Sequence, residues 1–230
     1  MKTDLVKYLK ERYDERNTHS SDPGPVVTIS RDCGCSGRKV SELLTDTLNQ
    51  RMEKHVPPII WRWVGKEIFM EAAKEMDLDP EMVEHVMEEK RGVLDEILSS
   101  QATKFYKNDK TVINTFAEVN RSMARHGHVI ILGRGGNPLT RDFAKSLHIY
   151  LEAPLEWRVN IICERMNFKK LEDAQKYVLQ TDKKRQLYRE HFEGKGNDYT
   201  WVDVKFNCMT LTTKEIVDAI INLMQSKKLI

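Results

Sequence analysis

The sequence predicts an α/β protein whose parallel sheet is covered by helices on both faces. Short apolar runs typical of buried strands alternate along the chain with longer segments of helical periodicity, and this alternation gives a parallel sheet. Turns rich in small residues or Pro follow three of the apolar runs, at residues 31–37, 133–136 and 152–154. Because ligands of such sheets bind at the carboxyl ends of the strands, we expect these turns to meet at one edge.

The first quarter of the chain contains two predicted strands. Residues 1–17 are highly charged and favour a polar helix, and residues 18–25 have the composition of a linker. The apolar run Val26–Ser30 predicts the first strand, and apolar residues at helical spacing predict a helix from residue 37 to about residue 51. Residues 57–61 are expected to form a short second strand.

The middle of the chain favours helices, followed by another strand. Helical patterns are expected at about residues 65–76, 80–91, 92–108 and 108–126. The continuous apolar run at residues 128–132 then predicts a buried strand, and a turn is expected at residues 133–138.

The last third repeats the alternation. A strand is predicted at residues 147–151, and a helix is expected to begin with Pro154 in its first turn and to reach about Met166. A Lys- and Arg-rich helix at about 169–191, a break at 194–198, a strand at 201–206 and a helix at 213–225 complete the expected order. Thr212 or Thr213 is the expected N-cap of the last helix.

Composition restricts the class of protein. A chain of 230 residues holds one α/β domain with a small appendage, or two small domains. Its 40% hydrophobic and 31% charged residues suit a globular protein, and a net charge of +2 argues against a nucleic-acid binder that relies on bulk electrostatics. No apolar run reaches about 18 residues and no signal peptide is recognisable, so we expect a cytoplasmic protein without a membrane partner.

The loop after the first strand has the character of a phosphate site. Small residues lead into a helix that opens on Arg38 and Lys39, so backbone N–H groups, the helix start and a cation can surround an anion. The loop fits the Walker pattern G-x-x-x-x-G-K-[ST] only at Gly37, which stands at the second Gly. Asp32 stands at the first Gly, Arg38 at the Lys and Lys39 at the Ser/Thr position. The alternative is a tight turn whose small residues serve packing alone.

Metal and thiol chemistry have weaker support in the sequence. Lys39 cannot ligate magnesium as a hydroxyl would, so the candidate contacts are Asp32, Ser36, Ser41 or water alone. Four cysteines (Cys33, Cys35, Cys163 and Cys208) are too few and too scattered for a disulfide scaffold, and the C-x-C pair at 33 and 35 has too few neighbouring ligands for a metal. The helix start is expected to lower the pKa of Cys33.

Four motifs, in order, resemble the cytidylate kinase-like family. They are Ile29-Ser30-Arg31 with its Gly/Ser loop and Gly37-Arg38, then Ile131-Leu132-Gly133-Arg134-Gly135, then His148 to Arg158, and finally Asp182-Lys183-Lys184-Arg185 with Tyr188. The resemblance runs from about residue 26 to the C-terminus. It implies a P-loop kinase-like fold at residues 26–230, with a central five-stranded parallel sheet, a helical acceptor-binding insertion at about 57–108 and a helical lid at about 155–198.

The implied reaction is transfer of the γ-phosphoryl group of ATP to a nucleoside monophosphate, with magnesium and with CMP or dCMP as the first candidate acceptor. The resemblance implies that ATP is bound by Gly34, Cys35, Ser36, Gly37, Arg38 and Lys39. It implies that the acceptor is bound by Arg134, Gly135 and Arg165, and that catalysis uses Arg38, Arg158, Arg185 and Asp182.

Departures from the family pattern leave alternatives open. Gly65 and Gly135 stand where relatives carry an acidic residue, and Lys39 is unmatched. These departures motivate a second hypothesis, a non-catalytic nucleotide-binding or sensing protein of the same fold. A third hypothesis is a protein that acts through its interactions and forms a homodimer through the N-terminal helix. Trp61 and Trp63 are interpreted either as base-stacking or as core residues.

Overall fold

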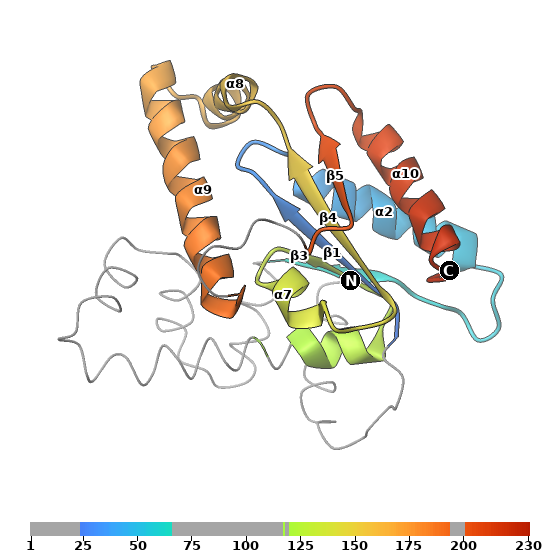
Figure 1. Cartoon of the computed structure of the whole chain (residues 1–230). Coiled ribbons are helices and arrows are strands. Elements are labelled where there is room, and N and C mark those ends of the chain that lie inside the picture. Colours follow the sequence, from blue (N-terminus) through green and yellow to red (C-terminus); the bar gives the residue numbers. More distant parts are fainter. Residues whose placement is uncertain (1–23, 66–116, 118–119, 194–200) are drawn as a thin grey trace, which may run out of the picture.

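The computed structural model describes residues 24–65, 117, 120–193 and 201–230 (Figure 1). Its centre is a five-stranded sheet in the order β2-β3-β1-β4-β5, and every pair of neighbouring strands is parallel. The strands are β1 (Val26–Arg31), β2 (Arg62–Val64), β3 (Val129–Leu132), β4 (Ser146–Glu152) and β5 (Val204–Asn207). The predicted parallel α/β fold is therefore confirmed.

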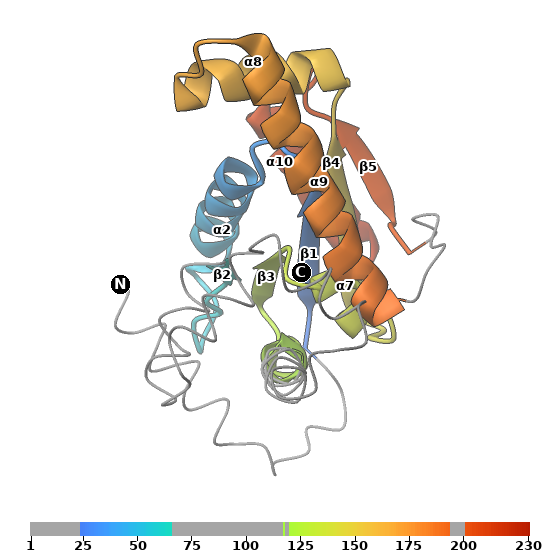
Figure 2. The same ribbon diagram turned by 90° about the vertical axis from the view of Figure 1, so that its left-hand side faces the viewer.

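Helices cover both faces of this sheet (Figures 1 and 2). Helices α2 (Gly37–Met52) and α10 (Thr213–Ser226) lie on one face, and α7 (Gly136–Thr140) and α9 (Leu171–Glu193) lie on the other. Helix α8 (Leu155–Met166) lies beyond the carboxyl ends of the strands. Residues 120–126 are also helical. No helix in the described part of the chain is long and apolar enough to cross a membrane.

The strand register brings the predicted turns together. The Asp32 N–H donates to the Leu151 carbonyl at 2.9 Å, which holds the start of the loop after β1 against the end of β4. The Gly133 N–H donates to the Ile29 carbonyl at 2.9 Å, which holds the turn after β3 on the other side of β1. The turns at 31–37, 133–136 and 152–154 thus meet at one edge, as the alternation predicts.

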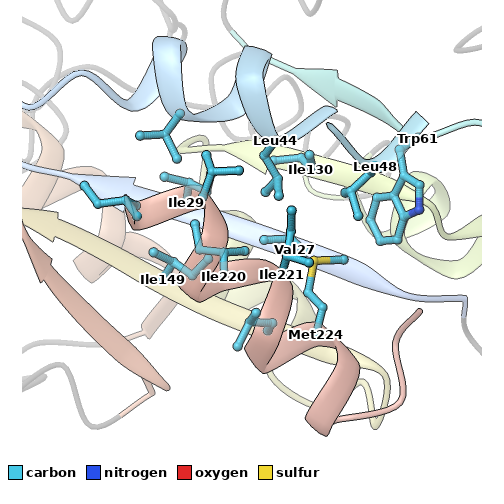
Figure 3. Packing of buried hydrophobic residues seen from close by; sticks show 14 of the residues in the cluster. Val27, Ile29, Leu44, Leu48, Trp61, Ile130, Ile149, Ile220, Ile221 and Met224 are labelled. Atoms are coloured by element: carbon cyan, nitrogen blue, oxygen red, sulfur yellow. The ribbon is translucent and has the colours of Figure 1, made fainter. Parts of the chain in front are cut away.

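The face under α2 and α10 is packed with apolar side chains (Figure 3). Period-two alternation points Val27 and Ile29 of β1 and Ile149 of β4 to this face. The two helices contribute Leu44, Leu48, Ile220, Ile221 and Met224, all of them buried. Burying one such side chain stabilises the fold by roughly 1.5–3 kcal/mol, so this cluster is a major source of stability.

The last helix begins as predicted, with Thr212 rather than Thr213 as the cap. The Glu215 N–H donates to Thr212 Oγ1 at 3.2 Å, and the Thr212 N–H donates to a Glu215 carboxylate oxygen at 2.8 Å. This reciprocal capping box satisfies donors at the helix start that have no partner within the helix.

The second strand is not where the sequence predicts it. Residues 57–61 are apolar, but Pro57 and Pro58 have no N–H to donate to a strand ladder. The Trp61 N–H and carbonyl are instead both bonded to the Asn49 side chain, at 2.7 and 3.0 Å. Strand β2 therefore begins only at Arg62.

Three further boundaries differ from prediction. Strand β5 begins at Val204 rather than at residue 201, because Asp203 Oδ2 accepts the His148 N–H before the regular ladder starts. Helix α7 occupies part of the predicted turn, and Pro138 lies in its first turn, where a missing N–H costs nothing. Pro154 precedes α8 as its N-cap instead of forming its first residue.

Several predictions lie outside the described residues. They are the N-terminal helix at 1–17, the helices at about 65–76, 80–91 and 92–108, the start of the helix at 108–126, and the break at 194–198.

Candidate functional site

The loop between β1 and α2 is the centre of the candidate site. Helix α8 approaches this loop so closely that a Cβ atom on Gly34 would lie 2.9 Å from the Cβ atom of Arg158. Gly34 also has a φ of +99°, which other residues rarely adopt. A glycine at this position is therefore required by both the backbone and the approach of α8.

Protein acceptors already engage several backbone donors of this loop. The Cys33 N–H donates to Asp182 Oδ1 at 2.6 Å, and the Gly37 N–H donates to the Cys35 carbonyl at 2.9 Å. The Cys35 N–H donates to the Asp32 carbonyl at 3.2 Å. A phosphate that used the Cys33 N–H would have to displace the carboxylate of Asp182.

Arg158 connects the loop to two helices. Its Nε donates to the Ala153 carbonyl at 2.8 Å, and its Nη1 donates to the Cys33 carbonyl at 3.2 Å and to Asp182 Oδ2 at 2.5 Å. Burial alone would lower the pKa of Arg158, but the hydrogen bond to Asp182 and the charges of Asp32 and Asp182 outweigh burial and raise it. Arg158 is therefore a fixed, permanently charged group next to the loop.

Asp32 is held on the same side of the sheet. The Tyr150 hydroxyl donates to Asp32 Oδ1 at 2.6 Å, and Arg158 Nε lies 3.8 Å from Asp32 Oδ2. Burial raises the pKa of Asp32, although the Tyr150 hydrogen bond and the Arg158 charge oppose that rise. The carboxyl group is thus surrounded by protein donors.

Two more arginines predicted from the family pattern reach the loop. Arg185 Nη1 donates to the Arg31 carbonyl at 3.2 Å and lies 3.9 Å from Asp182 Oδ1. Arg165 Nη2 lies 3.4 Å from the Gly34 carbonyl and 3.3 Å from Ser36 Oγ. The structure thus brings Arg158, Arg165, Arg185 and Asp182 from α8 and α9 to the segment 31–36.

The structure does not bring Arg38 to this group. Arg38 Nε is 2.8 Å from Glu42 Oε1 along α2, and its guanidinium lies 5.8 Å from the centre of the Trp63 ring. The side chain of Arg38 is 64% exposed, and Lys39 is exposed as well. Trp61 is buried in the core with its ring edge-on to His128, so it does not present a base-stacking surface.

Arg134 and Gly135 lie in the turn between β3 and α7. Both have a positive φ, and the Arg134 carbonyl accepts a hydrogen bond from Asn120 Nδ2 at 3.0 Å. A Cβ atom on Gly135 would lie 3.0 Å from the Phe192 ring, so the end of α9 packs directly on this turn. An acidic side chain in place of Gly135 would collide with α9. The packing of α9 therefore explains why this chain has a glycine where relatives carry an acidic residue.

A hollow of about 250 Å³ opens between α9 and the carboxyl ends of β1 and β4. It is lined by Arg31, Asp32, Tyr150, Leu179, Asp182, Lys183, Arg185, Gln186 and Arg189. Four of these side chains are cations and two are carboxylates, so the lining suits an anion. Among the described residues, neither Arg38 nor Arg134 belongs to this lining.

Among the lining residues that sequence reasoning did not assign to the site are Arg31, Tyr150 and Arg189. Arg31 lies so close to the turn after β3 that a Cβ atom on Gly133 would be 2.1 Å from Arg31 Nη1. Arg189 Nη1 is 3.5 Å from the Tyr150 hydroxyl, with its guanidinium 5.6 Å from the ring centre. Two signals in the sequence could have pointed to these arginines. Arg31 stands at the carboxyl end of a predicted strand, and Arg189 follows Arg185 by four residues, which places both on one side of a helix.

The candidate magnesium contacts of the loop and of α2 are engaged by protein groups. The described residues contain no group of three or more His, Cys, Asp or Glu side chains able to hold a metal. Asp32 and Ser36 contact Tyr150 and Arg165, as given above, and Ser41 is buried and donates to the Gly37 carbonyl within α2.

The prediction for the Cys33 thiol is wrong. Burial raises the pKa of Cys33, and this effect exceeds the lowering by Arg185. The two thiols of the C-x-C sequence also point into different clusters. Cys33 packs with Val159 and Ile162 near α8, whereas Cys35 belongs to the main core.

A family model and two solved structures are similar to this chain. The model of the cytidylate kinase-like family matches residues 26–207. A crystal structure of an uncharacterized protein from Eubacterium ventriosum ATCC 27560 is 18% identical, with a TM-score of 0.57 over 88% of this chain and 98% of that chain. Shikimate kinase from Acinetobacter baumannii, in complex with shikimate, is 14% identical, with a TM-score of 0.46 over 90% of this chain and 96% of that chain.

No curated protein matches the sequence. The family match nevertheless covers most of the chain and includes the loop after β1, the turn after β3 and both helices that carry the arginines. With its P-loop kinase-like sheet, the chain belongs to the cytidylate kinase-like family.

Proposed function

We propose that this protein transfers the γ-phosphoryl group of ATP to a nucleoside monophosphate, with CMP or dCMP as the first candidate acceptor. The observation that carries the proposal is the convergence of Arg158, Arg165 and Arg185 on the loop after β1. Phosphoryl transfer depends mainly on positioning and on neutralising charge that spreads over the transferred group. Several cations from different segments around one loop meet that requirement.

The residues take distinct roles in this proposal. Asp182 is a positioning residue, because one of its oxygens accepts from the Cys33 N–H and the other from Arg158. Arg158 fixes the loop through the Cys33 carbonyl, and Arg165 and Arg185 are the more exposed cations that turn toward the phosphates. The segment of about residues 155–198, which contains α8 and α9, is the proposed lid.

The hollow supplies the acceptor side of the proposed site. Arg31, Arg185 and Arg189 line it from two directions and are placed to bind the phosphate of a monophosphate acceptor. Arg134 and Gly135 remain proposed acceptor contacts in the adjacent turn. The proposed acceptor-binding insertion at about residues 57–108 falls largely outside the described residues. Asp32 and Ser36 remain the proposed contacts for the magnesium that would accompany ATP and neutralise phosphate charge.

A non-catalytic nucleotide-binding protein is the second candidate. The contact between Arg38 and Glu42 favours it, because the cation in the Walker lysine slot is then directed along α2 and away from the arginines of α8 and α9. Lys39 also offers no hydroxyl for the metal that accompanies ATP. This candidate predicts ATP binding without turnover.

A coupled ADP-release assay over a panel of nucleoside monophosphates, together with calorimetry of ATP binding, separates the two candidates. Arg185→Ala should lower kcat/KM by about a hundredfold, since one charge-stabilising contact is lost. Lys214→Ala, which removes an exposed cation paired with Asp218 on α10, is the matched control and should leave kcat/KM unchanged. ATP binding without turnover on any acceptor would favour the second candidate, and absence of ATP binding would reject both.

A further inference from the structure

Two thiols from distant parts of the chain meet at the functional edge of the sheet. Cys35 lies in the loop after β1, is only 6% exposed and belongs to the main apolar cluster. Cys208 follows β5 directly, is half-buried and packs against the same cluster. The side chains of the two residues are joined by a hydrogen bond.

The end of strand β4 anchors both segments that carry these thiols. The loop that carries Cys35 is held to the end of β4 by the Asp32 N–H, which donates to the Leu151 carbonyl. The Cys208 N–H donates to the next carbonyl of β4, that of Glu152, at 2.8 Å. These two carbonyls face opposite neighbours of β4, so the two segments flank the end of this strand. Both cysteine side chains turn to the face under α2 and α10, where each packs with the same apolar cluster, and there the two thiols can meet across the end of β4.

The two sulfurs are not equivalent. Cys208 accepts hydrogen bonds from the Cys35 thiol and from the backbone N–H of Ser36, and the Cys35 bond is the larger cause of its lowered pKa. The hydrogen bond to Cys208 and burial both raise the pKa of Cys35. Cys208 is therefore the more nucleophilic and more accessible thiol, and Cys35 is the protonated partner beside it.

We propose that Cys35 and Cys208 form a modification site at which hydrogen peroxide produces an intramolecular disulfide. The Cys208 thiolate attacks one peroxide oxygen, the O–O bond breaks, hydroxide leaves and Cys208 becomes a sulfenic acid. The Cys35 sulfur then attacks the Cys208 sulfur, the S–O bond breaks, and the hydroxyl leaves as water with the Cys35 proton. Peroxide is reduced, and the two thiols are oxidised to one disulfide.

The consequence for nucleotide binding rests on the proposed function. A disulfide would link the segment 32–36 covalently to the end of β5. It would also turn the Cys208 sulfur, which accepts the Ser36 N–H, from a thiol into a disulfide sulfur. A loop fixed in this way could not rearrange around phosphates. The oxidised protein is therefore expected to bind ATP at least several-fold more weakly than the reduced protein.

The test uses the full chain, reduced, freed of reductant and then treated with hydrogen peroxide. We expect two of its four thiols to disappear, peptide mapping without reductant to link Cys35 to Cys208, and dithiothreitol to reverse both changes. Cys163→Ser is the matched control and should still form the link, because Cys163 donates to the Phe168 carbonyl in another cluster.

Two variants test the order of the steps. Cys35→Ser should stop at the sulfenic acid of Cys208, which dimedone labels, and Cys208→Ser should leave Cys35 reduced. Circular dichroism establishes that each variant is folded. If one variant does not fold, the peptide map of the oxidised wild-type protein still shows whether Cys35 and Cys208 are linked.

A link between other cysteines, a link between two chains, or irreversible oxidation of Cys208 without a link would overturn the proposal. If the link forms but ATP never binds, the proposed function fails and the modification site stands; if ATP binds equally well in both states, the effect on the loop is refuted.

Discussion

The two faces of the sheet bury different kinds of side chain. The face under α2 and α10 is closed by apolar residues such as Leu44 and Ile221, neither of which is exposed at all. The face under α9 carries the charged hollow, where Tyr150 contacts Asp32 and Arg189. Since β1 and β4 contribute alternate residues to both faces, the same strands supply a stabilising core on one side and a charged hollow on the other.

The two sides of the molecule should respond differently to amino-acid substitutions. Apolar packing under α2 and α10 stabilises the fold directly. The ion pairs under α8 and α9 offer little net stability, because taking charges out of water offsets much of their attraction. We therefore expect substitutions on the first face to act on stability, and the removal of both members of an ion pair near α8 and α9 to act mainly on activity.

The largest effect is expected from Ile221→Ala. Removing this side chain from the core should lower the free energy of unfolding by about 4 kcal/mol, through lost burial and the cavity left behind. Urea unfolding measures the change, and activity per folded molecule should remain near that of the wild type. A loss of activity in the folded variant, with little loss of stability, would contradict the division between the faces.

Arg158→Met tests the ion pair between α8 and α9. Asp182 would keep the Cys33 N–H and the more distant Arg185. The loss of the Arg158 charge beside this partly buried carboxylate should nevertheless cost about 3 kcal/mol of stability. In Arg158→Met/Asp182→Leu, where both charges are removed, most of that stability should return while activity stays low. Urea unfolding and the coupled assay on the three proteins measure both quantities. A double variant as unstable as the single one would show that this ion pair is a structural requirement.

A titration effect should come from His148, on β4. Burial lowers the pKa of this imidazole to about 4, from 6.5, although the charge of Asp203 opposes the shift. The unfolded chain therefore takes up the proton first, so stability is complete above pH 6.5 and falls as the pH drops toward 4. Between about pH 8 and about pH 5, His148 should account for a loss of about 2 kcal/mol.

His148→Gln isolates this contribution, because a glutamine can still hydrogen-bond with Thr28 Oγ1 but does not titrate. Urea unfolding over the same pH range should show a correspondingly shallower decline. An unchanged decline would assign the pH dependence to other groups.

The smallest effect is expected at the start of α10. Thr212→Ala removes the side-chain half of the capping box and should destabilise the protein by about 1 kcal/mol. Thermal unfolding measures the loss, and Thr212→Ser, which keeps the hydroxyl, is the control. Equal losses in both variants would show that the methyl group, rather than the cap, matters.

Much of the fold could be predicted because its signals are local. Apolar runs located β1, β3 and β4, and Gly and Pro positions located the turns that meet at one edge. Strand β2 was misplaced because the Asn49 side chain, which comes from another element, binds the backbone of Trp61. A pairing between distant residues of this kind leaves no periodic trace in the sequence.

The site was predictable only in part for the same reason. Arg158 and Arg185 lie in ordered motifs, so the family pattern found them. Arg189 lies in a helix crowded with charges, and only the docking of α9 decides that it faces Tyr150 rather than solvent. Arg38 contacts Glu42, four residues further along α2, and the family pattern alone does not show that this local pair forms.

The uninterrupted course of α9 has a mechanical consequence. Asp182 holds the Cys33 N–H near the middle of this helix, and Phe192 rests on Gly135 near its end, a rise of about 15 Å further along. A single rigid helix therefore contacts both the loop after β1 and the turn after β3. A tilt of α9 that breaks the contact with the loop must also change its packing on the turn, so these two segments cannot move independently.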